Sequence, residues 1–522
     1  MSNHLVISKN HFGLNQSRRR LYFTKNTLHF HICSQKEMDS TIHFSYAIKL
    51  GFALMLFVSS VKIEEQIATL NLQIATPNLK PQTEQKDTSK SLQSLFKFGQ
   101  FSGSARYYFM ATDNKGSLSN FYANAFGMGI GYESAKIKGF QAGLSGYFID
   151  NLYSSDFTKL DSSTKQGSRY ELAQFNVLNP ATKTMMSRLE EVYLKYTYKK
   201  SFIKFGKQDF KSPFINPQDG RMRPTMVEGA ILDFNEIQKL KITSAWLHGI
   251  APRGTIDWFS IKETIGLFGT GTNPDGSKSP SPNQISTKGI FLLAATYSFT
   301  SNNKIQLLNQ YVENVFNTSL AQAEGSIAIN AHRNILYGVQ YIEQHAANNG
   351  GNANQTLAYL PKGSLARTFG GHLGIEWPKK WQAFINYNRI TKDGRFLMPR
   401  EWGREPFFTY MPRERNEGCG DVQAINLVAN KTFANSRLKI EYSYGHYYLP
   451  NIKNIALNKY GMPSYFQTNL DIRCQFKGYF KGIDAQFLYA YKGKIGNTYN
   501  QDKSIINRVN MSSYNLVLNF HF

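Results

Sequence analysis

A repeated alternation of apolar and polar residues restricts the fold of this chain more than any other feature. From residue 104 onward, segments of about ten residues carry an aromatic or aliphatic side chain at every second position. In residues 437–444 the apolar positions are Leu438, Ile440, Tyr442 and Tyr444. Successive side chains of an extended strand point to opposite faces. The segments therefore predict strands with one apolar and one polar face, and helical periodicity is nearly absent.

The connections between the predicted strands alternate in length. Short links occupy residues 199–201, 300–303, 378–380, 434–436 and 478–481. Long links occupy residues 209–224, 249–288, 344–366, 391–420, 450–464 and 493–507. A soluble β-sandwich has no reason to sort its loops in this way, whereas a membrane barrel has short periplasmic turns and long extracellular loops. We expect an all-β fold, a transmembrane antiparallel β-barrel of about 18 strands, which is wide enough to leave an aqueous channel.

Composition narrows the remaining classes. The 522 residues carry 60 Lys and Arg against 36 Asp and Glu, a net charge of +24, and 14% are aromatic. The aromatic content excludes a disordered chain, and the body of the chain lacks the charge-poor apolar run of about 20 residues that a membrane helix needs. The positive charge suits nucleic acid, an anionic surface or an acidic solute. Once the basic residues are distributed over a barrel and its loops, the argument for nucleic acid is lost, and we expect no nucleic-acid partner.

The start of the chain resembles an exported protein. Residues 50–58 are apolar, follow Lys49 and precede two serines, which is the layout of a signal peptide. Because this run lies far from Met1 and just after Met38, we predict that translation starts at Met38. Residues 1–37 are then a misassigned extension, 38–68 the signal peptide, 69–103 a polar periplasmic lead-in and 104–522 the barrel domain.

The cysteines Cys33, Cys419 and Cys474 lack the close spacing of a zinc or redox motif, so we expect no metal and no cofactor. Export places the chain in an oxidising compartment. Cys419 and Cys474 either pair there or remain two thiols, and the sequence leaves both open.

Closure of a barrel gives every strand one lipid face and one lumen face. Parity then predicts a ladder of inward basic residues: Arg106, Lys195, Lys204, Arg437, Lys439 and Arg473. Arg389 shares the apolar face of its segment, so we expect it at the membrane interface or in a loop. Basic side chains in a water-filled lumen favour anions because the low-dielectric wall focuses their field. For any single member, the alternative is a solvated lumen residue without a selective role.

The last segment alternates through Tyr514, Leu516, Leu518, Phe520 and Phe522, where the chain stops. This ending resembles the C-terminal signal of Gram-negative outer-membrane proteins. The resemblance implies that the barrel-assembly machinery is a partner and recognises Phe522. The alternative is the last strand of an ordinary secreted β-protein.

One segment resembles a known family. After Gly206 and Gln208, the chain carries Pro213, Asn216, Asp219, Arg221, Met222, Pro224 and Gly229. This spacing is similar to a pattern of OprD-family outer-membrane porins. The resemblance implies a barrel of eighteen strands in outer-membrane lipid, often trimeric, with an inward-folded loop that narrows the channel. It also implies a basic ladder that guides carboxylate-bearing solutes such as amino acids, peptides or organic acids.

Carried over to this chain, the resemblance makes Asp219, Arg221 and Arg223 candidates for the constriction. These residues either contact the solute or pin the loop, and both roles can hold together. The acidic pocket of the family's basic-amino-acid transporters finds no match here, which leaves the substrate open.

A second cluster lies in residues 393–417, where basic, acidic and aromatic residues share one long loop. Arginine binds a carboxylate through two hydrogen bonds, and the aromatic residues of this loop offer stacking surfaces. They are Trp402, Phe407, Phe408 and Tyr410. We favour an internally salt-bridged loop folded on the barrel. In the other interpretation the loop enters the mouth, and Arg395, Arg400 and Arg404 form a vestibule site.

Passive, substrate-preferring diffusion of small anionic or zwitterionic solutes across the bacterial outer membrane is the leading functional hypothesis. An outer-membrane barrel hydrolase would need a nucleophile held by a base, and no G-x-S-x-G or Ser/His/Asp arrangement stands out, so we expect no enzyme. A surface adhesin that uses the loops stays open. A TonB-dependent transporter is disfavoured, because too few residues precede the first strand to form a plug.

Overall fold

The computed structural model describes residues 22–24, 27–29, 92–182, 184–218, 220–268, 271–279, 282–378, 380–433 and 437–522. The chain divides into two units, Met1–Ala68 and Thr69–Phe522. In the first, β1 (Tyr22–Thr24) and β2 (Thr27–His29) form a short antiparallel pair. The rest of the predicted extension, the predicted signal peptide and residues 69–91 of the predicted lead-in lie outside the described residues.

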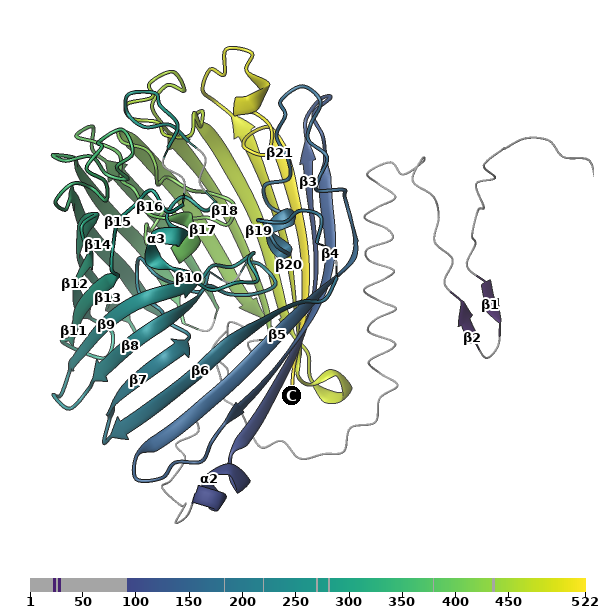
Figure 1. The fold of residues 1–522 in the computed structure, drawn as a ribbon, viewed down its shortest axis with the longest axis vertical. Coiled ribbons are helices and arrows are strands. Elements are labelled where there is room, and N and C mark those ends of the chain that lie inside the picture. The colour runs from purple at the N-terminus through teal and green to yellow at the C-terminus, as the bar shows by residue number, and fades with distance from the viewer. Residues whose placement is uncertain are drawn as a thin grey trace, which may run out of the picture. The chain divides into compact units, whose positions relative to one another are not determined.

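Within the described part of the second unit, 18 antiparallel strands close into a barrel (Figure 1). Each strand pairs with the next one, and β21 pairs with β3 to close the ring. The strands are β3 (Gln100–Asn114), β4 (Phe121–Glu133), β5 (Phe140–Ser154), β6 (Met186–Tyr198), β7 (Ser201–Gln208), β8 (Met226–Phe234), β9 (Leu240–Ala251), β11 (Ile290–Ser298), β12 (Lys304–Val312), β13 (Phe316–Asn330), β14 (Arg333–Ala346), β15 (Leu365–Trp377), β16 (Trp381–Ile390), β17 (Val422–Phe433), β18 (Leu438–Tyr448), β19 (Tyr465–Gln475), β20 (Ile483–Lys494) and β21 (Met511–His521). The predicted fold class is confirmed.

Short elements accompany the barrel. They are α2 (Leu92–Lys97), β10 (Phe259–Ser260), α3 (Ile261–Thr264) and the 3-10 turns η1 (Leu172–Gln174), η2 (Arg400–Trp402), η3 (Gly478–Phe480) and η4 (Asp502–Ser504). α2 is fixed to the barrel because Ala135 N donates to the Leu95 carbonyl at 3.0 Å and the Tyr132 hydroxyl donates to the Phe96 carbonyl at 2.6 Å. No helix among the described residues has the length and apolar character to cross a membrane.

The two ends of the barrel differ. At the turn end, where the C terminus and α2 lie, the connections are tight (Figure 1). At the loop end, long connections span residues 155–185, 209–225, 252–289, 347–364, 391–421, 449–464 and 495–510. Two connections at this end are short, residues 115–120 and 313–315. The predicted sorting by length is therefore correct apart from these two links.

The alternation of the sequence maps onto the two faces of the wall. In β6, Leu194 and Tyr198 point outward and are 54% and 55% exposed, whereas Arg188 and Glu190 point inward and are buried. Aromatic pairs mark the outward face at the turn end, such as Trp377 and Trp381, whose rings stack at 3.8 Å. An apolar outer band bordered by aromatic residues suits a lipid bilayer, and closure leaves no unpaired strand edge in it.

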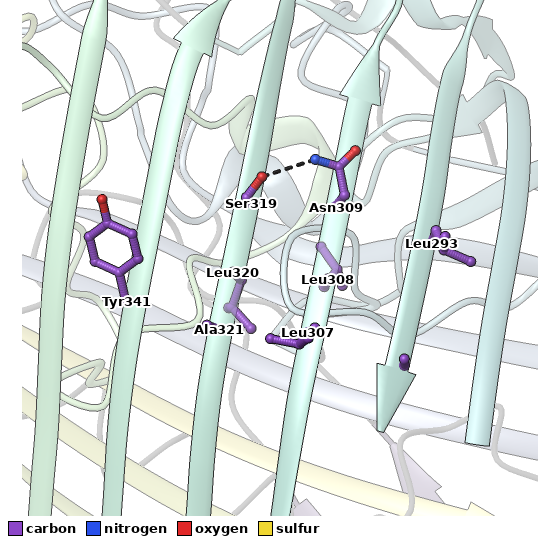
Figure 2. Close-up of a pocket in the computed structure, with 9 residues that line it drawn as sticks. Leu293, Leu307, Leu308, Asn309, Ser319, Leu320, Ala321 and Tyr341 are labelled. Atoms are coloured by element: carbon purple, nitrogen blue, oxygen red, sulfur yellow. Dashed lines mark hydrogen bonds between the residues drawn. The ribbon is translucent and has the colours of Figure 1, made fainter. Parts of the chain in front are cut away.

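An apolar hollow of about 340 Å³ lies in this wall between β11 and β14 (Figure 2). Leu293 and Leu307, which line it, are both more than half exposed on the outward face. Asn309 donates to the Ser319 hydroxyl at 3.0 Å beside them. The hollow therefore faces lipid and is separate from the interior of the barrel.

The interior is packed by loops. Phe214, Phe316 and Trp402 belong to one buried cluster that joins loop residues to wall residues. The Trp402 indole donates to the Thr264 hydroxyl at 2.9 Å and its ring lies 6.1 Å from that of Phe316. The loops thus form a second core inside the ring of strands.

Candidate constriction site

The loop of residues 391–421 lies inside the barrel, held mostly through its own backbone. Polar side chains from five strands of the wall donate to its carbonyl oxygens. These bonds are Gln344 to Leu397 at 2.7 Å, Gln340 to Pro406 at 3.0 Å, Asn426 and Tyr447 to Thr409 at 2.8 Å each, Gln467 to Pro412 at 2.7 Å, Asn469 to Pro412 at 3.1 Å, and Lys492 to Arg413 at 3.0 Å. Because β14 and β20 lie far apart around the ring, the loop spans the interior.

The loop of residues 209–225 joins the first loop in the interior. Arg106, on β3, donates to the Arg221 carbonyl at 2.7 Å and to the Asn519 side chain at 2.6 Å. Asn216 donates to the Arg404 carbonyl at 3.0 Å, and its backbone N–H bonds the Trp402 carbonyl at 2.9 Å. The two loops therefore support each other as well as leaning on the wall.

Three arginines from three loops surround one tyrosine. The guanidinium carbons of Arg169, Arg413 and Arg221 lie 5.4, 5.5 and 6.0 Å from the centre of the Tyr170 ring. Arg169 is exposed, and Arg413 is half-buried. We call Tyr170, Arg169, Arg221, Arg253, Arg413 and Arg415 the arginine cluster.

Positive charge is concentrated in the arginine cluster, and it shifts the pKa values of the residues there. Burial would raise the pKa of Tyr170, but nearby cations lower it below its ordinary value; they are Arg169, Lys492, Arg413 and Arg221. Burial, and then the charge of Arg413, lower the pKa of Arg221 to about 10. Burial and three positive neighbours lower the pKa of Arg253 well below its ordinary value; the neighbours are Arg221, Arg415 and Arg413. Such repulsion costs free energy unless an anion offsets it.

Two buried carboxyl groups near the cluster have raised pKa values. Glu171 accepts hydrogen bonds from Thr112 at 2.5 Å and from Ser168 at 2.7 Å, and its burial raises its pKa. Burial and the proximity of Glu405 raise the pKa of Glu414 well above its ordinary value. These groups therefore neutralise less positive charge than their number suggests.

The three predicted constriction residues have different surroundings. Arg221 lies in the arginine cluster. Arg223 is 1% exposed, and among the described residues none accepts a hydrogen bond from its guanidinium. Its charged neighbours include Arg188 and Glu190, which pair with each other at 2.8 Å. Asp219 lies outside the described residues.

Most of the predicted basic ladder has specific partners. Arg106 is buried under the loop of residues 209–225, as described above. The ammonium of Lys195 lies 5.1 Å from the Phe202 ring, and that of Lys204 lies 3.0 Å from an Asp209 oxygen.

Near the turn end, Lys439 pairs with Glu441 at 3.0 Å and Arg473 with Asp471 at 2.9 Å. Arg437 stands in the turn directly before β18, so the prediction that it is a strand residue is wrong, while the predicted direction of its side chain stays a prediction. The turn ends there because pairing of β17 with β18 begins only at Leu438.

The predicted vestibule residues lie within the folded loop. Arg395 donates to the Ala456 carbonyl at 3.0 Å and to the Thr272 carbonyl at 2.5 Å. Arg400 pairs with the buried Glu417, and exposed Arg404 lies 4.4 Å from the Tyr410 ring centre. Internal salt bridging and entry into the barrel, expected as alternatives, therefore occur together in this loop.

The structure also shows the positions of Arg389 and of the two cysteines Cys419 and Cys474. Arg389 points outward from β16, one residue before the strand ends, and pairs with Asp421 at 2.5 Å. It therefore lies at the border between the wall and the loops, as expected. Cys419 and Cys474 are both free thiols. Among the described residues, no three His, Cys, Asp or Glu side chains gather as metal ligands would.

Several residues of the arginine cluster were not predicted. Arg413 and Arg415 belong to the charged segment of residues 393–417, but nothing in their spacing distinguishes them from Arg395 or Arg404. Arg169, Tyr170 and Arg253 lie in loops without any motif.

Comparison with known proteins places this geometry in context. The family model described as outer membrane porin, OprD family, matches residues 97–373. No curated protein matches the chain. Among solved structures, OccK9 (OpdG) of Pseudomonas aeruginosa has a TM-score of 0.64 at 14% identity, with 82% of this chain and 99% of that chain covered. OccAB2 of Acinetobacter baumannii has a TM-score of 0.65 at 14% identity, with the same coverage. OpdK of Pseudomonas aeruginosa, solved with vanillate, has a TM-score of 0.62 at 13% identity, again over 82% and 99%.

Proposed function

This chain belongs to the OprD family of outer-membrane porins, and from that membership we propose that it passes small anionic or zwitterionic solutes, above all carboxylates, by passive diffusion. The arginine cluster carries the proposal, because it puts several guanidinium groups on the two loops that cross the barrel and on the loops beside them. Arginine binds carboxylates strongly and keeps its charge at any physiological pH. Fold and family point to a channel rather than an enzyme.

The related OpdK was solved with vanillate, an aromatic carboxylate. This supports a carboxylate as the preferred group, and Tyr170 offers a ring face beside the guanidinium groups. We assign Arg221 to solute contact through the cluster and Arg106 to holding the loop of residues 209–225. Arg223 stays a second candidate for solute contact, because no described residue accepts a hydrogen bond from its buried guanidinium. Lys195, Lys204, Lys439 and Arg473 provide a weaker, largely ion-paired basic path along the wall.

Arg404 is the best candidate for a first contact in the vestibule, because it is exposed and lies over Tyr410. Arg395 and Arg400 instead stabilise the loop. The proposed precursor carries residues 38–68 as a signal peptide. The family resemblance supports a homotrimer, and the terminal Phe522 supports recognition by the barrel-assembly machinery.

Single-channel recording in a planar bilayer with a KCl gradient tests the proposal. We expect stepwise conductance with a reversal potential that shows anion preference. Arg413→Gln should lower the anion-to-cation permeability ratio about two- to five-fold, since it removes one charge of the cluster from a low-dielectric site.

Lys453→Gln is the matched control, because Lys453 is exposed in the loop of residues 449–464 and should leave the ratio unchanged. A folded barrel that never conducts would refute the channel proposal and favour the adhesin alternative. Equal ratios in Arg413→Gln and wild type would remove the cluster from ion selection.

A further inference from the structure

The arginine cluster has more positive charge than one carboxylate can offset. Tyr170 has three guanidinium groups within 6.0 Å of its ring centre, and Arg253 and Arg415 contribute to the same positive field. The groups come from the loops of residues 155–185, 209–225, 252–289 and 391–421. The arginines therefore come from four different loops and do not lie in a row along a single strand.

Some of these guanidinium groups have unused donors. Within the described residues, none accepts a hydrogen bond from the side chains of Arg169 or Arg253. Arg221 Nε and Arg253 Nε are buried without an acceptor among the described residues. A buried donor left unpaired costs about 1–3 kcal/mol, more when it is charged. The site is thus incomplete without an anion that accepts at several points.

Among the described residues, no carboxylate bonds or pairs with the side chains of Arg169, Arg221 or Arg253. Glu171 is bonded to Thr112 and Ser168, and Glu417 is paired with Arg400. Glu405 accepts from the Asn416 N–H at 2.7 Å and lies 3.9 Å from Arg415. An ammonium group would find guanidinium groups around it, which disfavours an amino acid as the solute.

We propose that the preferred solutes are small polycarboxylates, with two or three carboxylate groups spaced to meet different arginines of the cluster. This inference rests on the proposed function and narrows its solute class. Each additional carboxylate gains a charge-assisted bond to a guanidinium that a monocarboxylate leaves unpaired. Carboxylates spaced along a carbon chain can reach several of the arginines around Tyr170, whereas the charge of phosphate is confined to one compact group.

Block of single-channel current tests this proposal. Butyrate, succinate and tricarballylate form a series of one, two and three carboxylates on similar carbon chains, and glycine and inorganic phosphate complete the set. In about 1 M KCl, long-range attraction is screened to a few ångströms, so differences report direct contact. We expect half-block by succinate and tricarballylate at concentrations at least about 10-fold lower than by butyrate, one further charged contact being worth about 1.4 kcal/mol.

The variant Arg169→Gln/Arg253→Gln should reduce that succinate-to-butyrate ratio to near unity. Neither side chain donates to another described residue, so folding should survive, and heat-modified migration on a gel verifies it. Lys453→Gln should keep the ratio. Equal block by butyrate and succinate, stronger block by phosphate than by succinate, or preferred block by glycine would each overturn the inference. In all three outcomes, anion-preferring conductance would still support the proposed function.

Discussion

At the residue scale, Tyr170 is the unusual group, because its phenol is 7% exposed and lies among arginines. Nearby cations favour an ionised phenolate and hold the pKa of Tyr170 below that of an ordinary tyrosine. Because its pKa is lowered, the Tyr170 phenol becomes a negatively charged phenolate at a lower pH than an ordinary tyrosine does. Ionisation would place a negative charge inside the cluster and offset part of its attraction for anions.

We predict that anion preference in wild type weakens as the pH rises, before the pH reaches the ordinary tyrosine pKa of about 10. Tyr170→Phe cannot ionise and should lose less of its preference over the same pH steps, because only the loss of positive charge at Lys492 and Arg221 then remains. Reversal potentials in a fixed KCl gradient at stepped pH measure the effect. Tyr479→Phe, at an exposed site near the turn end, serves as control. Parallel pH profiles in Tyr170→Phe and wild type would contradict the prediction.

At the scale of elements, the two interior loops are held by side chains that point inward from the wall. Arg106 is the main support of the loop of residues 209–225 from β3, since its buried guanidinium bonds both the Arg221 carbonyl and Asn519. The loop of residues 391–421 rests mainly on several neutral amides, with the Tyr447 hydroxyl and the Lys492 ammonium beside them. Loss of one amide should matter less than loss of Arg106, because a hydrogen bond from a charged group contributes about 1.5–3 kcal/mol against about 1 for a neutral pair.

Arg106→Ala should therefore loosen the loop of residues 209–225 and widen the path. We expect a single-channel conductance about 1.5-fold or more above wild type, noisier open current and faster protease cleavage within this loop, as local unfolding becomes cheaper. Lys439→Ala removes a lumen charge paired with Glu441, away from both loops, and is the control. Unchanged conductance and protease resistance in Arg106→Ala would show that the loop holds its position without this bond.

At the scale of the whole molecule, the C-terminal strand closes the barrel. β21 pairs with β3, and the backbone of Phe522 exchanges hydrogen bonds with Gly103 at 2.8 and 3.1 Å. A side chain on residue 103 would collide with the Phe522 ring, which is why glycine suits this position. The Phe522 side chain is nevertheless 55% exposed, so its ring contributes little buried area to the closed barrel.

Deletion of Phe522 should reduce the amount of heat-modifiable barrel in the outer membrane of expressing cells about five-fold or more. Refolding of purified chain in detergent should change little, because most β21–β3 pairs remain. Quantitative gels of membrane fractions and of refolding reactions measure the two quantities. Tyr479→Ala removes another exposed aromatic residue at the same end as a control. Equal insertion of the deletion variant and wild type would reject recognition through Phe522.

The sequence alone predicted the wall of the barrel well, because strand geometry is local. In β19, every second residue from Gln467 to Arg473 faces inward, as its parity predicts, since neighbouring side chains of a strand must point to opposite faces. The outward position of Arg389 follows from the same rule. The approximate strand number and the sorting of loops also follow, because each turn is marked by the break in alternation.

Only the tertiary structure decided how the loops use the interior. Arg169, Arg221 and Arg413 have no common spacing or period, and they meet at Tyr170 only because three loops enter the same closed ring of strands. The ion pairs of Lys204 and Arg473 depend on which acids fold beside them, so parity predicted their direction but not their free charge. Loop conformation is set by contacts between distant segments, whereas the alternation of a strand is written within a few consecutive residues.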